Sequence, residues 1–151
     1  MSETKYFDDL NIGDKTTSAS RTITEADIVN FAGLSGDYNP IHIDVTYAEK
    51  SPFKQRIAHG LLVLSIASGL FTTTDLNLSI KGSLIALMDV KCQFKNPVFI
   101  GDTIHVEAEI KEKKETSKGD RGVVIMERIV YKQNGDVALK IEATLMMRRK
   151  V

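Results

Sequence analysis

Residues 59–71 read His-Gly-Leu-Leu-Val-Leu-Ser-Ile-Ala-Ser-Gly-Leu-Phe, a stretch that is apolar nearly all the way round a helix. Only two serines and one internal glycine interrupt the apolar side chains, so the stretch has no continuous polar face. A helix that is apolar on every side is normally buried inside a protein. The stretch therefore predicts a buried central helix, which the rest of the chain must cover.

The second half of the chain changes to the two-residue period of β-strands. Strands are predicted over residues 83–94, 103–110, 123–131 and 137–148, and the last of these alternates apolar and polar side chains almost strictly. Asn134-Gly135 predicts a tight hairpin between the last two strands. The stretch 111–121, rich in Lys, Glu and Gly, is expected to form a mobile loop.

The first half of the chain predicts short elements. Residues 16–23 have moderate strand character. Thr24 and Asp27 have the spacing of a capping box, which predicts a helix beginning directly after Thr24. Residues 35–43 indicate a loop and residues 44–49 a second short helix. Helices followed by long strands favour an α+β fold, in which an antiparallel sheet wraps around the central buried α-helix.

Composition limits the classes of function. The length of 151 residues predicts a single domain over residues 1–151, with 42% hydrophobic and 26% charged residues as in ordinary globular proteins. Twenty basic residues balance twenty acidic ones, so we expect no nucleic-acid partner. No signal-peptide core or membrane-length apolar run occurs, and the lone Cys92 excludes a disulfide framework. These features predict a cytoplasmic protein without a membrane partner, in which Cys92 is a packed, unreactive thiol.

The densest group of chemically useful side chains lies in the loop 35–42. Asp37, Asn39 and His42 bring a carboxylate, an amide and an imidazole into a segment shaped by Gly and Pro. An Asp and a His five residues apart can converge on one water and move protons near neutral pH. The structural alternative is that Asp37 and Asn39 only stabilise a turn and that His42 is a buried, hydrogen-bonded residue.

His59-Gly60 immediately precedes the apolar helix. The free N–H groups at a helix N-terminus can hold an anionic oxygen, and a glycine lets a ligand approach the backbone closely. Alternatively, Gly60 only permits tight packing. His42 and His59 lack the spacing of common metal-binding motifs, so no metal is expected. The chain also lacks the nucleophile elbow, the P-loop and the dinucleotide-binding glycine motif.

The loop sequence Ser-Gly-Asp-Tyr-Asn-Pro-Ile-His at 35–42 resembles the hydratase-2 motif of the MaoC-like dehydratases, the (R)-specific enoyl-CoA hydratases. Residues 6–14 resemble the family's opening F-x-x-L-x-x-G-D, and residues 94–102 resemble its F-x-x-P-V-x-x-G-D. Residues 57–61 and 65–70 resemble the start and body of its central helix. The resemblance extends over about the whole chain.

This resemblance implies a hot-dog fold and a homodimer, or an assembly of dimers, with active sites near the subunit interface. It implies hydration of trans-2-enoyl-CoA to (R)-3-hydroxyacyl-CoA, or the reverse dehydration, and therefore a hydro-lyase. The catalytic pair falls on Asp37 and His42, and the backbone N–H that holds the thioester oxygen falls on Gly60. Three residues would support the site: Asn39, His59 and the helix serine Ser68. No cofactor is implied, because CoA is part of the substrate.

Three other functions remain open at this level. The same fold could hold an acyl-CoA thioesterase, or a dehydratase that acts on acyl carrier protein substrates. The chain could also bind acyl-CoA without turning it over. The acyl chain length depends on the residues that close the binding tunnel, which the sequence does not identify.

Overall fold

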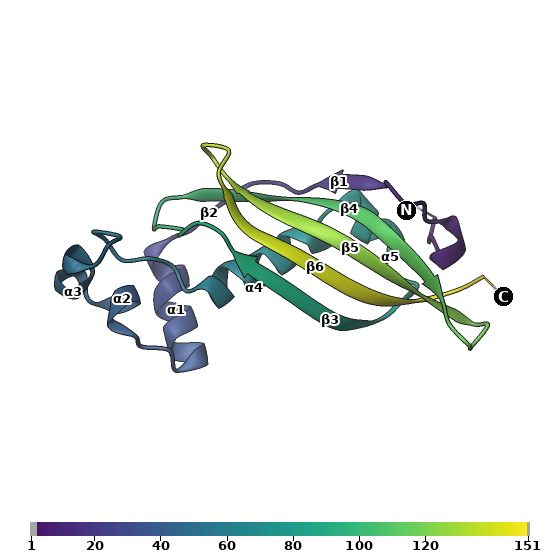
Figure 1. Ribbon diagram of the computed structural model, residues 1–151, viewed down its shortest axis with the longest axis horizontal. Helices are drawn as coiled ribbons and strands as arrows, with labels where there is room; N and C mark the ends of the chain where they lie inside the picture. Colours follow the sequence, from purple (N-terminus) through teal and green to yellow (C-terminus); the bar gives the residue numbers. More distant parts are fainter. Residues whose placement is uncertain (1–2, 151) are drawn as a thin grey trace.

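The computed structural model describes residues 3–150, in which a six-stranded antiparallel sheet wraps around one long helix, α4 (Figure 1). Helix α4 runs from Gly60 to Thr72, as the apolar stretch predicts. The strand order is β1-β4-β5-β6-β3, and β2 also pairs with β4. The predicted α+β class and the sheet wrapped around the central helix are both confirmed.

The four long strands are β3 (Leu84–Phe94), β4 (Thr103–Glu115), β5 (Arg121–Lys132) and β6 (Val137–Arg148). The tight turn between β5 and β6 is confirmed, with Gly135 at a φ of 87°. The loop predicted over residues 111–121 is confined to residues 116–120, and its bounds were too wide. β4 and β5 stay paired past a register shift at Ile110, as far as Glu115 opposite Gly122. The side chains at this end of the hairpin are charged because they extend beyond the hydrophobic core. A charged stretch of this kind resembles a loop in the sequence.

Seven shorter elements complete the described chain: η1 (Phe7–Asp9), β1 (Lys15–Thr17), β2 (Arg21–Thr22), α1 (Glu25–Ser35), α2 (Pro40–Ile43), α3 (Val45–Lys50) and α5 (Asp75–Ile80). The capping box of Thr24 and Asp27 is present at the start of α1. The single strand predicted over 16–23 is two short strands instead. The predicted loop 35–43 ends in a helical turn, because Pro40 is well suited to the first position of a helix.

Helices α1 to α3 gather at one end of the sheet, beyond the N-terminus of α4 (Figure 1). This arrangement brings the loop between α1 and α2 to the start of the central helix. The termini of the described chain lie at the opposite end (Figure 1). None of the helices described is long and apolar enough to cross a bilayer.

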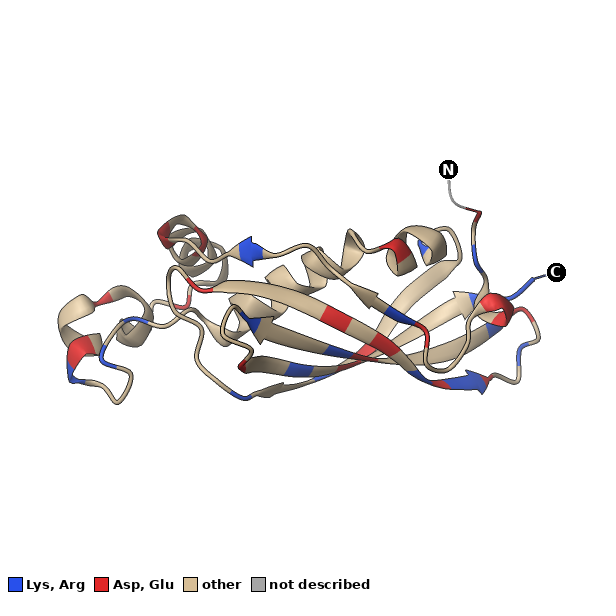
Figure 2. Ribbon diagram, turned by 90° about the horizontal axis from the view of Figure 1, so that it is seen from above, with Lys and Arg blue, Asp and Glu red and all other residues tan. Residues whose placement is uncertain are grey.

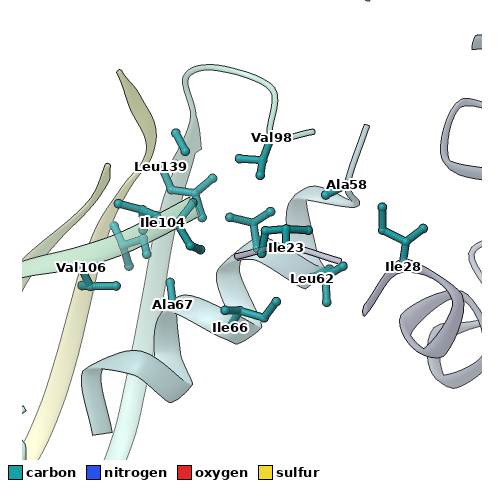
Figure 3. Close-up of a cluster of buried hydrophobic side chains, with 14 residues drawn as sticks. Ile23, Ile28, Ala58, Leu62, Ile66, Ala67, Val98, Ile104, Val106 and Leu139 are labelled. Atoms are coloured by element: carbon teal, nitrogen blue, oxygen red, sulfur yellow. The ribbon is translucent and has the colours of Figure 1, made fainter. Parts of the chain in front are cut away.

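The core lies between one face of α4 and the sheet. Leu62, Ile66 and Ala67 of α4 pack with Ile104 and Leu139 of the sheet (Figure 3). Cys92 packs against the same cluster, and burial raises the pKa of its thiol. The interior is therefore continuous from the helix to the strands, and the packed cysteine agrees with the sequence prediction.

Helix α4 is not buried on every side within one chain, and that prediction is wrong. Leu61 is 61% exposed, and Ser65, Ser68 and Gly69 are also exposed. The sheet covers only one face of the helix. No charged residue lies on α4, whereas charged residues are spread along the strands (Figure 2). One uncharged face of the central helix is thus open in the single chain.

A buried ion pair fixes the turn that leads from β3 to β4. Lys132 Nζ lies 2.8 Å from Asp102 Oδ2 and donates to Pro97 O at 3.0 Å. Asp102 also accepts hydrogen bonds from Gln133 Nε2 and from the backbone N–H of Phe99. Burial acts to raise the pKa of Asp102, but these hydrogen bonds and the Lys132 charge outweigh it and lower the pKa.

We expect Asp102→Asn to destabilise the protein by about 3–5 kcal/mol at pH 7, because Lys132 then stays buried without its charge partner. The lowered pKa means that Asp102 stabilises the fold above its unfolded pKa of about 3.9, and that this contribution disappears as the pH falls through the folded value. The difference between wild type and variant should therefore shrink below about pH 4. Urea unfolding between pH 3 and pH 7 measures it, and a difference independent of pH would contradict the assignment.

Candidate active site

The loop between α1 and α2 holds Asp37 in a fixed orientation. Helix α1 ends at Gly36, whose φ of 75° is left-handed and therefore favours glycine. The Ser35 hydroxyl then accepts a hydrogen bond from the Asp37 N–H. Asn39 donates to Asp37 Oδ1 from its backbone N–H at 3.1 Å and from its side-chain amide at 2.7 Å. One carboxylate oxygen of Asp37 is thereby occupied, and the other is left for chemistry.

The ring of His42 faces this second oxygen. His42 lies on α2, and its Nδ1 lies 2.7 Å from Ile57 O. A carbonyl only accepts, so Nδ1 carries a hydrogen, and Nε2 is the nitrogen that remains free. His42 Nε2 lies 4.0 Å from Asp37 Oδ2. This separation is too long for a direct hydrogen bond, but one water or hydroxyl can bond to both atoms at about 2.8 Å.

The two side chains differ in their surroundings. The His42 side chain is 11% exposed, whereas that of Asp37 is 37% exposed. The hydrogen bond from the Asn39 backbone is the largest influence on the Asp37 carboxyl, and with the Asn39 amide it lowers the pKa. Asp37 is therefore ionised at neutral pH and places a negative charge beside the imidazole.

His59 joins the loop to the start of α4. It is the N-cap of α4, it is 2% exposed, and its Nε2 donates to Asp37 O at 2.9 Å. Its ring stacks on that of His42 with 3.9 Å between centroids, and Phe31 packs against it at 4.9 Å. His59 thus contacts both members of the Asp37 and His42 pair.

Asp37, His42 and His59 are also the candidate metal ligands of the described chain. Each offers one ligand atom, and the three atoms lie within 4.8 Å of one another. The two imidazoles, however, are stacked with only 26° between their planes. Lone pairs lie in the plane of an imidazole, so those of stacked rings run side by side and do not converge on one ion. This geometry favours proton transfer over metal binding.

An apolar cleft opens beside the N-terminus of α4. Its volume is about 380 Å³, and it is lined by Phe53, Ile57, Ala58, Gly60, Val63, Phe94, Lys95, Asn96, Pro97, Val98 and Leu139. The Gly60 N–H has no acceptor among the described residues, as expected for the first residue of a helix. A free backbone donor therefore lies at the wall of an apolar cleft.

The Phe94 ring packs directly against Gly60 in the wall of the cleft. A Cβ atom added to Gly60 would lie 2.6 Å from Phe94 Cε1, closer than any normal contact. Glycine thus allows the Phe94 ring to pack directly against the helix N-terminus. Asp37 and His42 do not line the cleft. Residues 57–60 connect this pair to the cleft, because Ile57 and Gly60 line the cleft and Ile57 O accepts a hydrogen bond from His42 Nδ1.

The structure brings together five of the six residues singled out from the sequence: Asp37, Asn39, His42, His59 and Gly60. Ser68 is not among them. It lies eight residues after Gly60, about 12 Å farther along the helix axis, is exposed, and makes no side-chain hydrogen bond within the described chain. Sequence reasoning missed Ile57 and Phe94, because a carbonyl acceptor and a distant aromatic ring leave no local pattern.

Comparison of this chain with known proteins identifies several relatives. The chain is 41% identical over 99 residues to an (R)-specific enoyl-CoA hydratase of Rhodospirillum rubrum, covering 66% of this chain and 65% of the relative. It is 32% identical over 138 residues to the (R)-specific enoyl-CoA hydratase of Aeromonas caviae, covering 91% and 96% of the two chains. The chain spans 65% of the length of that Rhodospirillum hydratase, 31% of a relative named protein MaoC and 64% of a 3-hydroxybutyryl-CoA dehydratase.

Solved structures agree with the fold. The crystal structure of a MaoC-like dehydratase from Rhodospirillum rubrum has a TM-score of 0.87 at 27% identity, covering 97% of this chain and 99% of that one. A Mycobacterium tuberculosis protein with a double hot-dog fold has a TM-score of 0.78 at 18% identity, covering 97% and 45%. The sheet wrapped around α4 is thus a hot-dog fold. Residues 10–132 match the family described as "MaoC like domain". The chain belongs to this MaoC-like family.

Proposed function

We propose that this protein adds water to trans-2-enoyl-CoA to give (R)-3-hydroxyacyl-CoA and catalyses the reverse dehydration. The observation that carries the proposal is the 4.0 Å separation of Asp37 Oδ2 and His42 Nε2, with every other polar atom of the two side chains already hydrogen-bonded. The names of the two hydratase relatives support the reaction and its (R) stereochemistry.

The pair acts on one water in the hydration direction. Water bonds to Asp37 Oδ2 and His42 Nε2, and its oxygen attacks C3 of the enoyl thioester. His42 Nε2 takes the proton, because Asp37, with its lowered pKa, is the weaker base. The negative charge of Asp37 then stabilises the imidazolium. The same proton is delivered to C2, so one water is consumed and both side chains return to their starting state.

Gly60 stabilises the charge that the attack creates. As the C3–O bond forms, the π electrons of the double bond move toward the thioester oxygen. The free Gly60 N–H at the positive end of α4 donates to that oxygen. Asn39 and His59 keep Asp37 in place through the hydrogen bonds described above. The apolar cleft beside Gly60 holds the acyl group in this proposal. The proposed reaction uses no cofactor or metal.

CoA is the carrier we favour, because three curated relatives named for CoA esters match this chain at 32–41% identity, whereas a relative from Solanum lycopersicum named for acyl carrier protein matches at 25%. A relative from Arabidopsis thaliana named 3-hydroxyacyl-[acyl-carrier-protein] dehydratase also matches, at 32% identity over 95 residues. The acyl carrier protein thus remains the second candidate carrier. A cytoplasmic location stays a prediction from the sequence.

A spectrophotometric assay with crotonyl-CoA tests the reaction. We expect the absorbance of the conjugated enoyl thioester to fall, and an (R)-specific 3-hydroxyacyl-CoA dehydrogenase to oxidise the product. Oxidation only by an (S)-specific dehydrogenase would refute the stereochemistry. If no enoyl thioester of CoA or acyl carrier protein reacts, and a saturated acyl-CoA releases thiol, the protein is a thioesterase and the proposal is wrong.

We also propose that the protein is a homodimer. Strand β3 is an edge of the sheet, and Ile85, Leu87, Met88 and Val90 on it are each at least 40% exposed. An exposed apolar edge strand normally pairs with another chain. A second copy at this edge would also reach the open, uncharged face of α4. Ser68 lies on that face. The family resemblance implies that Ser68 supports a catalytic loop, and in this dimer the supported loop would belong to the second copy.

Replacing Leu87, which is 52% exposed, with Lys should shift the protein from dimer to monomer, because the charge would be buried in the interface. Sedimentation velocity measures the mass against 16.8 kDa for one chain. Ile12→Lys is the control, because Ile12 is 66% exposed away from β3. A wild-type protein that sediments as a monomer at micromolar concentration would disprove the dimer.

A further inference from the structure

The helical turn that carries His42 depends on contacts from elsewhere. Helix α2 has four residues and no side-chain cap at its N-terminus. A helix this short is not stable by itself. Ile57 holds it at two points: the Ile57 N–H donates to Ile41 O at 3.3 Å, and Ile57 O accepts from His42 Nδ1. The position of His42 is therefore set by the segment that precedes α4.

Arg56 adds a third connection from the same segment. Its Nη1 donates to His42 O at 3.4 Å. This carbonyl lies in the last turn of α2, where carbonyl groups lack partners within the helix and a positive charge is favourable. Arg56 thus bonds to the backbone of the same residue whose side chain faces Asp37.

The other end of this connection is Glu25, the first residue of α1. Arg56 Nη1 lies 2.9 Å from Glu25 Oε1, and Nη2 pairs with Oε2 of the same carboxylate. Such two-point pairs fix direction as well as distance, because the guanidinium is planar. The Arg56 side chain is only 17% exposed, although Glu25 is 55% exposed. Arg56 therefore links the beginning of α1 to the end of α2.

We propose that Arg56 is a positioning residue for the hydration reaction: Glu25 holds its guanidinium, which fixes the His42 carbonyl and with it the approach of His42 Nε2 to Asp37. The inference rests on the proposed function. Arg56 has no hydrogen bond to Asp37, so it acts on the reaction through His42. A lysine would carry the charge but would not bond to both Glu25 and His42 with a fixed geometry.

The kinetic test compares variants of two arginines, Arg56 and Arg21, each of which pairs with a carboxylate in the first turn of α1. We expect Arg56→Met to lower kcat by about 10- to 100-fold, as a small misplacement of a catalytic group does, and to change KM by less than about twofold. Arg56→Lys should recover part of kcat. Glu25→Gln keeps Arg56 but loosens it and should lower kcat less, and the double variant should be no worse than Arg56→Met alone.

Arg21→Met is the matched control. Arg21 Nη2 pairs with Asp27 Oδ1 at 2.6 Å, so it is also an arginine-carboxylate pair at the start of α1, but Arg21 has no bond to α2. Its removal should leave kcat unchanged. Thermal melting of each variant confirms that the compared proteins are folded. Equal loss of kcat in Arg21→Met and Arg56→Met would mean that only the stability of α1 matters and would overturn the inference.

Nuclear magnetic resonance of the three ¹⁵N-labelled histidines gives a readout that does not require turnover. In the wild type we expect the proton of His42 on Nδ1, and in Arg56→Met we expect shifted or broadened His42 signals. His105, on β4 beside Glu107, should not change. If no enoyl thioester of CoA or acyl carrier protein reacts but the His42 signals shift in Arg56→Met, the proposed function fails and the positioning of His42 by Arg56 stands. If the wild type reacts and Arg56→Met keeps both kcat and the His42 signals, the positioning is wrong.

Discussion

Replacing His42 with Asn should lower kcat for crotonyl-CoA hydration by about 10²- to 10⁴-fold, the usual contribution of a general acid-base residue. An asparagine amide can occupy the place of Nδ1 and still donate to Ile57 O, so α2 should stay in position. What the variant lacks is Nε2, the atom that faces Asp37 Oδ2. The initial rate of loss of enoyl absorbance measures the effect.

Asp37→Asn should cause a loss of similar size, for a different reason. The new side chain keeps an oxygen for the two donors of Asn39, but it places an N–H₂ group where Oδ2 accepted the water. His105→Asn is the control, since His105 lies on the opposite face of β4 from the buried Ile104 and Val106. Turnover near the wild-type rate in either Asp37→Asn or His42→Asn would remove that residue from the mechanism.

The second large effect concerns the backbone N–H of Gly60, which Gly60→Pro removes. Proline is well tolerated at the first position of a helix, and the preceding His59 has φ of −58° and ψ of 132°, which a following proline requires. No internal hydrogen bond is lost, because this N–H has no acceptor among the described residues. We expect kcat to fall by about 10²- to 10³-fold, the usual cost of one oxyanion donor.

The Phe94 ring must be controlled for, because any Cβ at position 60 would collide with it. Gly60→Ala keeps the N–H but displaces the ring into the cleft, so it should lower kcat/KM on its own. In a Phe94→Ala background this loss should disappear, whereas the loss caused by Gly60→Pro should persist. Equal activity of the alanine and proline variants in that background would rule out the N–H as a donor to substrate.

Gly69→Ala completes the comparison. Gly69 lies on the same helix, and an added Cβ there meets nothing within 4 Å. The substitution should raise stability by up to about 1 kcal/mol, since alanine is the better helix former. Because Gly69 lies on the face of α4 that the proposed second copy would reach, the activity of Gly69→Ala is compared only after sedimentation velocity shows the wild-type mass, and it should then equal that of the wild type. The variant separates effects of glycine replacement in α4 from effects at the N-terminus.

The local patterns of the sequence determined most of the elements. The apolar stretch after His59 specified α4, the alternation in residues 137–148 specified β6, and Thr24 with Asp27 specified the start of α1. Each pattern reports an interaction between residues close in the chain, or the side of an element that must face the core. Asp37, Asn39 and His42 were found for the same reason, since they share one loop.

The tertiary structure alone decided how these side chains are used. The tautomer of His42 depends on the carbonyl of Ile57, 15 residues away, and the place of Arg56 depends on Glu25, 31 residues away. Packing between Gly60 and Phe94 shapes the cleft, and coverage by one sheet leaves a face of α4 open. Periodicity and turn signals are properties of neighbouring residues. The distances that govern proton transfer instead join segments that only folding brings together, so the sequence identified the reactive groups and the fold set their geometry.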